Sequence, residues 1–183
     1  MPFNIPTVTT NDISFGPAVL YLGAAGDTPT VDVGAIAEDG VSIEITNEIK
    51  QIMQGNPRVN VYSFSQQSNV ALSFTSIEWD FNNLLYSLGG GSTSASSSES
   101  FYNFGGNPAV TEVAILVQHY MAVSGNTMHV RLWKAQSAGG TTIPFGQDEH
   151  SFEYNFTAVR STTDWGGGAL TADQELVQLF REG

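Results

Sequence analysis

Three histidines are the side chains in this sequence best suited to hold a metal ion: His119, His129 and His150. His119 and His129 flank one expected turn, so they could approach each other, and Glu112 or Asp148 could supply a third ligand. The positions do not fit any known spacing of metal ligands. The chain also has no cysteine, which excludes disulfides, thiolate metal sites and a thiol nucleophile. We therefore expect no metal site, and histidines that lie on sheet faces or in loops.

Catalytic residues are equally hard to find. The serines lack the G-x-S-x-G turn that exposes a hydrolase nucleophile. Asp148, Glu149 and Glu153 could form the carboxylate pair of a glycosidase, but adjacent acids before a strand usually form a solvated turn. The glycines that begin segment 89–100 have no lysine after them, so they do not form a phosphate-binding loop. We expect a protein that is not an enzyme and has no cofactor.

Exposed aromatic side chains leave a carbohydrate-binding function open. Among the three tryptophans, Trp79 is expected at the start of a helix, as a core anchor. Trp165 precedes three glycines in an expected loop, and either it or Tyr102 could stack on a sugar ring.

The charge distribution argues against tight binding of nucleic acid. The formal net charge is −12, from 18 acidic and 6 basic residues. Six scattered cations cannot form the basic patch that phosphate backbones require. Residues 1–49 contain no Lys or Arg and the following acids: Asp12, Asp27, Asp32, Glu38, Asp39, Glu44 and Glu48. No apolar run approaches the roughly 20 residues that span a bilayer, and the first residues do not resemble a signal peptide, so we expect synthesis in a cytoplasm and no membrane contact.

The first half of the chain predicts an extended arm over 1–16, a short strand over 18–22, a loop over 23–40 and a long hairpin. A period of two begins at Val41 and places Val41, Ile43, Ile45 and Ile49 on one face, which we expect to be buried. The opposite, wet face carries Ser42, Glu44, Thr46 and Glu48. Gly55-Asn56-Pro57 predicts the turn, and further strands are expected over 58–64 and 70–75, separated by Gln66-Gln67-Ser68.

A helix is expected over 79–88 because its apolar residues recur at helical spacing and Gly89 stands where a C-terminal cap belongs. Segment 89–100 should be a flexible Gly/Ser-rich loop. Further strands are expected over 111–120, over 128–132 after the turn at 124–126, and over 151–159. Thr171 and Gln174 form the sequence pattern of a capping box, which predicts a short C-terminal helix.

Together these elements predict a mainly β protein with one domain over residues 1–183. Its expected fold is a two-layer β-sandwich or open barrel of about seven strands, with a flanking α-helix and a short C-terminal helix. Only 13% of residues are charged, against about a quarter in soluble domains. A surface with so few charges is often covered by other protein.

The sequence resembles the tail tube (major tail) proteins of siphophages, whose fold type VI secretion tube proteins share. The resemblance rests on four parts of the chain, which occur in the order of the family's elements: Phe15 to Gly23, Gly34 to Glu48, Val70 to Thr75 followed by Glu78 to Leu85, and Phe152 to Val159. It implies a ring, a hexamer in the family, whose inner sheets join into one barrel and whose rings stack through the N-terminal arm and the long hairpin. Segment 89–100 has no counterpart in this pattern.

The implied function is that of a structural subunit of a virion tail, forming an electronegative conduit for DNA. Ser42, Glu44, Thr46 and Glu48 are the candidate lumen-facing residues, because an acidic lining repels phosphate. The implied partners are further copies of the chain, other tail proteins such as the tape measure and the terminator, and double-stranded DNA that passes without tight binding. The alternatives are a head–tail completion or capsid decoration protein, a carbohydrate-binding β-sandwich and a glycosidase.

Overall fold

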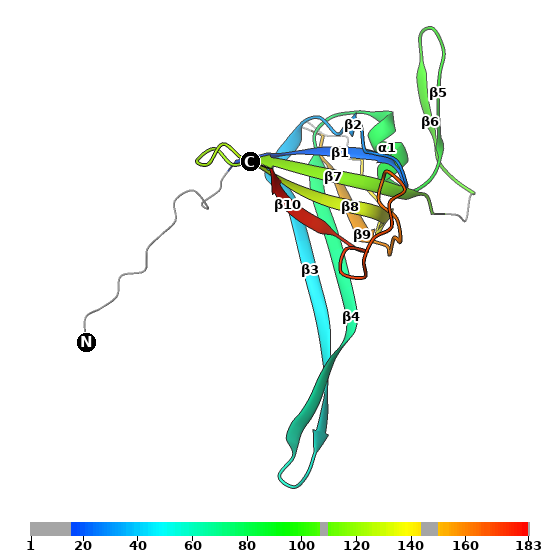
Figure 1. The fold of residues 1–183 in the computed structure, drawn as a ribbon. Helices are drawn as coiled ribbons and strands as arrows, with labels where there is room; N and C mark the ends of the chain where they lie inside the picture. The colour runs from blue at the N-terminus through cyan, green and yellow to red at the C-terminus, as the bar shows by residue number, and fades with distance from the viewer. Residues whose placement is uncertain (1–15, 107–109, 144–149, 183) are drawn as a thin grey trace.

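The computed structural model describes residues 16–106, 110–143 and 150–182. Over these ranges the chain is mainly β, with one short helix (Figure 1). In chain order the elements are β1 (Ala18–Ala24), β2 (Val31–Asp32), β3 (Ile36–Gln54), β4 (Val59–Ser76), α1 (Phe81–Ser87), β5 (Ser92–Ala95), β6 (Ser100–Asn103), β7 (Glu112–Tyr120), β8 (Thr127–Ser137), β9 (Phe152–Ala158) and β10 (Gln178–Glu182). The described part of the chain contains no helix long and apolar enough to cross a membrane.

One antiparallel sheet holds most of the strands, in the order β2-β1-β7-β8-β9-β4-β3, and β10 pairs with β8. Two strands pair with the same edge of β8: β10 pairs with its first half, and β9 pairs with residues 135–137. The sheet therefore turns a corner at β8, and its two halves face each other across the core. This open, curved sheet confirms the expected mainly β fold; it does not close into a barrel.

The core lies between the two halves of the sheet, where the expected strand parities place the apolar side chains. β4 contributes Val70, Leu72 and Phe74, and β9 contributes Phe152, Tyr154 and Phe156; all six are at most 3% exposed. Leu20, Leu22, Val113, Ile115, Val117, Val130 and Leu132 cover them from β1, β7 and β8. The expected strands in these regions are confirmed, and β7 has a strand on each side.

The two strands of the long hairpin are longer than the sequence pattern predicts. β3 begins at Ile36, inside the expected loop, and β4 runs without a break through Gln66, Gln67 and Ser68. A register shift between Glu48 and Ile49 absorbs one residue of this polar run as a bulge. The prediction of separate strands over 58–64 and 70–75 is therefore wrong, because polar residues do not end a strand whose two faces are both wet.

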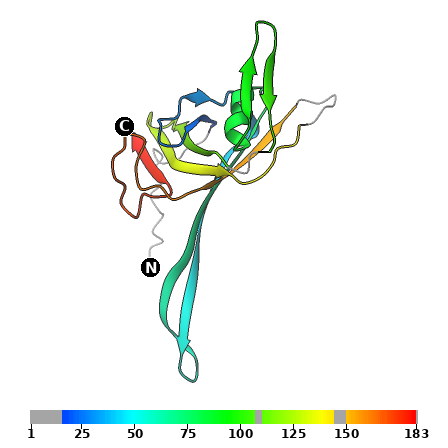
Figure 2. The same ribbon diagram turned by 90° about the vertical axis from the view of Figure 1, so that its right-hand side faces the viewer.

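The helix prediction is confirmed, although α1 is shorter than expected. The Asp80 carboxylate accepts a hydrogen bond from the Asn82 N–H at 2.8 Å and caps the N-terminus. Gly89 follows the helix with a φ of 64°, as a C-terminal cap requires. Beyond it, residues expected as a loop form the β5–β6 hairpin, which projects from the body (Figure 2).

The expected C-terminal helix is wrong. The Thr171 N–H does donate to Gln174 Oε1, at 3.3 Å, but the two residues close a turn rather than a helix. Residues 178–182 then form β10 and gain a ladder of backbone hydrogen bonds along the free half of β8. The expected arm over 1–16 lies almost wholly outside the described residues, and the single domain stays a prediction.

Candidate self-assembly surfaces

The distal half of the β3–β4 hairpin exposes apolar side chains on an unsupported two-stranded ribbon. The hairpin leaves the body and carries no other element on either face (Figures 1 and 2). Residues 44–68 are all exposed, and Tyr62 is 63% exposed. The large apolar side chains among them are Ile45, Ile49, Ile52, Met53, Val59, Val61, Tyr62 and Phe64. A two-stranded hairpin is at best marginally stable alone in water, and an exposed apolar surface of this kind is a candidate site for contact with another molecule.

The apolar face of β3 continues beyond the body that covers its beginning. Val41 and Ile43 are half-buried against the core, whereas Ile45 and Ile49 are 56% and 59% exposed. The expectation that all four are buried within the chain is therefore wrong for Ile45 and Ile49. Their alternation is regular, but only Val41 and Ile43 among the four pack against the core.

The outer edge of β3 is a second surface that another chain could cover. β3 pairs with β4 at Ile36 and from Val41 to Gln54, and among the described strands none pairs with its other edge. Such an edge presents unpaired N–H and C=O groups, and it invites strand addition from a neighbour. Lys50 is the one basic side chain on it.

A polar face lies on the outside of β3, β4 and β9. Ser42 and Glu44 border a shallow hollow of about 320 Å³ with Ser73, Asn155 and Thr157 from the neighbouring strands. Farther along β3, Thr46 lies opposite Asn69 and Glu48 opposite Gln67, which continues the polar row. All four sequence-predicted residues, Ser42, Glu44, Thr46 and Glu48, are exposed. Their role in lining a lumen stays a prediction.

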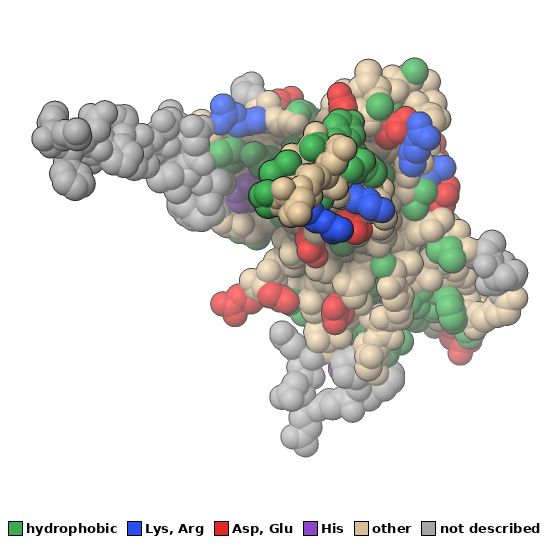
Figure 3. Space-filling model, turned by 90° about the horizontal axis from the view of Figure 1, so that it is seen from below, with side chains coloured by type: hydrophobic (Ala, Val, Ile, Leu, Met, Phe, Trp, Pro, Cys, Tyr) green, Lys and Arg blue, Asp and Glu red, His purple; other side chains and the backbone are tan. Residues whose placement is uncertain are grey.

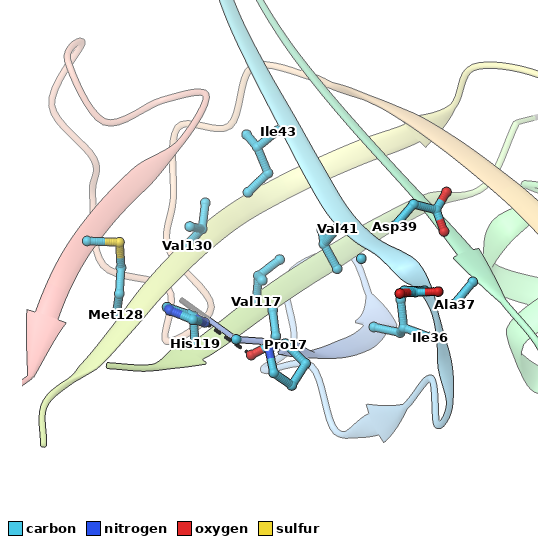
Figure 4. Close-up of a pocket in the computed structure, with 14 residues that line it drawn as sticks. Pro17, Ile36, Ala37, Asp39, Val41, Ile43, Val117, His119, Met128 and Val130 are labelled. Atoms are coloured by element: carbon cyan, nitrogen blue, oxygen red, sulfur yellow. Dashed lines mark hydrogen bonds between the residues drawn. The ribbon is translucent and has the colours of Figure 1, made fainter. Parts of the chain in front are cut away.

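An apolar groove of about 750 Å³ opens at the mouth of the curved sheet (Figure 4). It lies between the start of β3 and the strands β1, β7 and β8. Ile36, Val41, Ile43, Val117 and Val130 form its apolar walls. Glu38 and Asp39 also border it and are exposed, and the Asp39 carboxylate accepts a hydrogen bond from the Thr75 hydroxyl on β4 at 3.5 Å.

The histidines do not converge. Within the β7–β8 ladder His119 pairs with Met128 and Gln118 pairs with His129, so the two histidines lie on opposite faces of the sheet. His119 Nδ1 lies 3.1 Å from the Pro17 carbonyl oxygen, and His129 Nε2 lies 3.2 Å from a Glu182 oxygen. The described residues contain no group of three potential metal ligands.

Among the acids considered for catalysis, Glu153 alone lies in the described part of the chain. Glu112, considered as a third metal ligand, is paired with Lys134 at 2.9 Å. Glu153 accepts a hydrogen bond from Asn155 at 3.2 Å. Asp148 and Glu149 lie outside the described residues.

The two aromatic residues considered for sugar binding make contacts with other residues of the chain. Trp165 packs edge-on against Trp133, with ring centroids 5.0 Å apart. Tyr102 donates a hydrogen bond to the Gly90 carbonyl at 2.7 Å and stacks beside Phe81. Trp79, expected in the core, is 46% exposed and rests on Phe152.

The sequence and the structure were compared with those of known proteins. No protein-family model and no curated protein matches the sequence. Among solved structures, the chain is similar to a chain from the "Tail of empty GTA particle computed with helical refinement, C6 symmetry". The TM-score is 0.46 at 8% sequence identity, and the match covers 85% of this chain and 96% of that chain. A likeness at this level does not by itself assign a function to this chain.

Proposed function

We propose that this protein is the structural subunit of a phage tail tube, which assembles with copies of itself into stacked rings. The observation that carries the proposal is the β3–β4 hairpin, whose exposed apolar side chains and free β3 edge require cover from another protein. A second copy is the simplest cover, because the edge strand and the groove are both present in every copy. The ring of six and the contacts with tape measure and terminator proteins come from the family resemblance alone.

The chemistry of the polar face suits the inner wall of such a tube. Ser42, Glu44 and Ser73 belong to a surface of small, uncharged or acidic side chains on neighbouring strands. If the free edge of β3 joins the next subunit, these faces continue around the ring as one concave sheet. An acidic lining repels the DNA backbone, so a duplex passes without sticking.

Negative-stain electron microscopy of the purified full-length protein at rising concentration tests the proposal. We expect rings and stacked hollow cylinders. A head–tail completion protein would stop at single rings, and a decoration protein would stay small without a capsid. Particles that remain monomeric at every concentration would overturn the proposal.

A further inference from the structure

A separate cleft lies between α1 and the β5–β6 hairpin, at the end of the body away from the long β3–β4 hairpin. The β5–β6 hairpin stands beside α1 and projects from the body (Figures 1 and 2). It is built largely from segment 89–100, which has no counterpart in the tail tube pattern, so the proposed function does not account for it. The cleft has a volume of about 420 Å³, within the range of roughly 300–1,000 Å³ that small-molecule sites occupy.

The indole ring of Trp79 borders the cleft and is 46% exposed. Two neighbours hold this ring in place. The buried ring of Phe152 meets it nearly edge-on, with centroids 4.9 Å apart, and the indole Nε1–H donates a hydrogen bond to His150 Nδ1 at 3.4 Å. An aromatic ring that is already held in one orientation loses little freedom when a flat ligand packs on it. Trp79 therefore offers a pre-formed stacking surface.

Polar side chains border the cleft on the side of the body. Asp80 and Asn82 lie at the start of α1, next to Trp79. Asp80 Oδ1 accepts a hydrogen bond from the Asn82 backbone N–H at 2.8 Å, which fixes the carboxylate. Its second oxygen, Oδ2, can accept from a ligand hydroxyl, and the Asn82 carboxamide can both donate and accept.

Hydroxyl groups border the cleft on the side of the hairpin. Thr93 pairs with Tyr102 in the β5–β6 ladder, and the Tyr102 ring stacks beside Phe81 on α1. Ser100 lies two residues before Tyr102 on the same strand, so it shares the face of Tyr102. Thr93 and Ser100 therefore lie on the α1 side of the hairpin, across the cleft from Asp80 and Asn82.

The charge of the cleft limits the ligands that it can accept. Among the described residues that border it, Asp80 is the one charged side chain, and none is a cation. Lys and Arg side chains are visible instead on the face seen from below, opposite the β5–β6 hairpin (Figure 3). An anionic ligand would bring a negative charge close to Asp80 with no cation to pair with it. The cleft therefore favours a ligand without negative charge.

We propose that the cleft between α1 and the β5–β6 hairpin binds an uncharged saccharide. A sugar ring has an apolar face of C–H groups, which packs on Trp79, and a rim of hydroxyls, which bind Asp80, Asn82, Thr93 and Ser100. A purely apolar ligand would instead bury the Asp80 carboxylate without a partner. Each copy of the chain carries the whole cleft, so this inference goes beyond the proposed tube and does not depend on assembly.

A glycan array tests the proposal on the full-length protein. The array carries oligosaccharides of glucose, galactose, mannose and N-acetylglucosamine, together with sialylated and uronic-acid saccharides. We expect binding to uncharged saccharides and not to the acidic ones. For a saccharide that binds, isothermal titration should show a Kd raised about tenfold or more by Trp79→Ala and less by Trp79→Phe, which keeps an aromatic ring. Tyr120→Ala removes an aromatic side chain that is 61% exposed on β7, outside the cleft, and should bind like the wild type.

Polar substitutions check the same site without removing the indole. Asn82→Ala should raise the Kd, because it removes a hydrogen-bonding group at an exposed position. Asp80→Asn keeps a residue type that caps helices and should weaken binding by removing the charged acceptor. Circular dichroism checks the fold of each variant, and Trp79→Phe with Asn82→Ala decides the test if Trp79→Ala does not fold.

The proposal is wrong if no uncharged saccharide binds, if acidic saccharides bind better, or if the cleft variants bind like the wild type. A blank array together with altered sedimentation of the Trp79→Ala assemblies would mean that the cleft contacts protein instead. The titrations use protein below the concentration at which it assembles. Saccharide binding and tube assembly can therefore fail independently of each other.

Discussion

Three buried aromatic residues pack on the core side of β4 and β9, behind the polar face. The ring centroid of Phe74 on β4 lies 5.0 Å from that of Tyr154 and 6.1 Å from that of Phe156, both on β9. All three are at most 3% exposed, and burial raises the pKa of the Tyr154 hydroxyl. Their packing fixes how β4 and β9 lie, and therefore how the outward residues between them are presented.

Truncation of this core should lower stability strongly. We expect Phe74→Ala, Ile115→Ala and Phe156→Ala each to cost about 2–5 kcal/mol, because each leaves a cavity among side chains that cannot collapse fully. Chemical denaturation measures the loss. Val123→Ala, at a side chain that is 45% exposed, is the control and should change stability by less than about 0.5 kcal/mol. Three truncations that left the unfolding midpoint unchanged would mean that these strands face the other way.

A surface ion pair should contribute to stability in a defined pH range. Arg160 donates two hydrogen bonds to the Glu175 carboxylate, at 2.7 and 2.8 Å, and these bonds lower the pKa of Glu175. A lowered pKa in the folded state means that the stabilisation is present above the unfolded pKa and disappears as the pH falls through the folded pKa. The melting temperatures of Glu175→Gln and the wild type should therefore differ at neutral pH and converge in acid. A difference that persisted in strong acid would contradict this assignment.

The acids on the polar face should affect DNA passage more than assembly. Glu44 and Glu48 are exposed, so reversing both to Lys should leave the fold and the rings intact. If they line the channel, the variant presents cationic rings that bind phosphate and slow the passing DNA. Ejection kinetics of particles built with E44K/E48K measure this effect. Ejection at the wild-type rate would mean that Glu44 and Glu48 do not line the channel.

At the scale of elements, the two halves of the β3–β4 hairpin differ, because one half packs against the core and the other is exposed to solvent. Its first half, up to Ile43 and Val70, closes the core. Its second half contacts no other described element and offers apolar and basic side chains to solvent. The two halves can therefore be separated by mutation.

Shortening the hairpin should abolish assembly and preserve the fold. Replacing residues 49–66 by Asn-Gly joins Glu48 to Gln67, which are paired across the ladder, through a two-residue turn. We expect thermal unfolding close to that of the wild type, because the deleted residues bury nothing in the chain. Light scattering should show no large species. A shortened protein that still polymerised would place the joint elsewhere.

The sequence predicts the core strands well because their alternation of apolar and polar residues matches their burial. It could not predict where the body stops along β3, since Ile45 and Ile49 follow the same period as Val41 and Ile43. The apolar residues of 58–64 fall on both faces, and this irregular pattern was the available sign of a ribbon exposed on both sides. The groove was missed because it joins strands that are far apart in the sequence. Thr171 and Gln174 make their expected hydrogen bond, but pairing with β8 outweighs a short, marginal helix.

At the scale of the whole molecule, the surfaces that need a partner lie on different parts of it. Under the proposed function, the free edge of β3 meets a lateral neighbour, and the projecting hairpin meets the next copy along the tube. The low charged fraction of 13% is consistent with a chain that is covered on several sides. Lateral and axial contacts of this kind would generate rings that stack into a tube.

A cryo-electron microscopy map of the assembled protein tests the central claim most directly. The account predicts a hollow cylinder whose inner wall is the polar face of β3, β4 and β9, with Ser42, Glu44, Thr46 and Glu48 directed into the channel. A map with this face on the outer wall, or an assembly with no channel, would contradict the account.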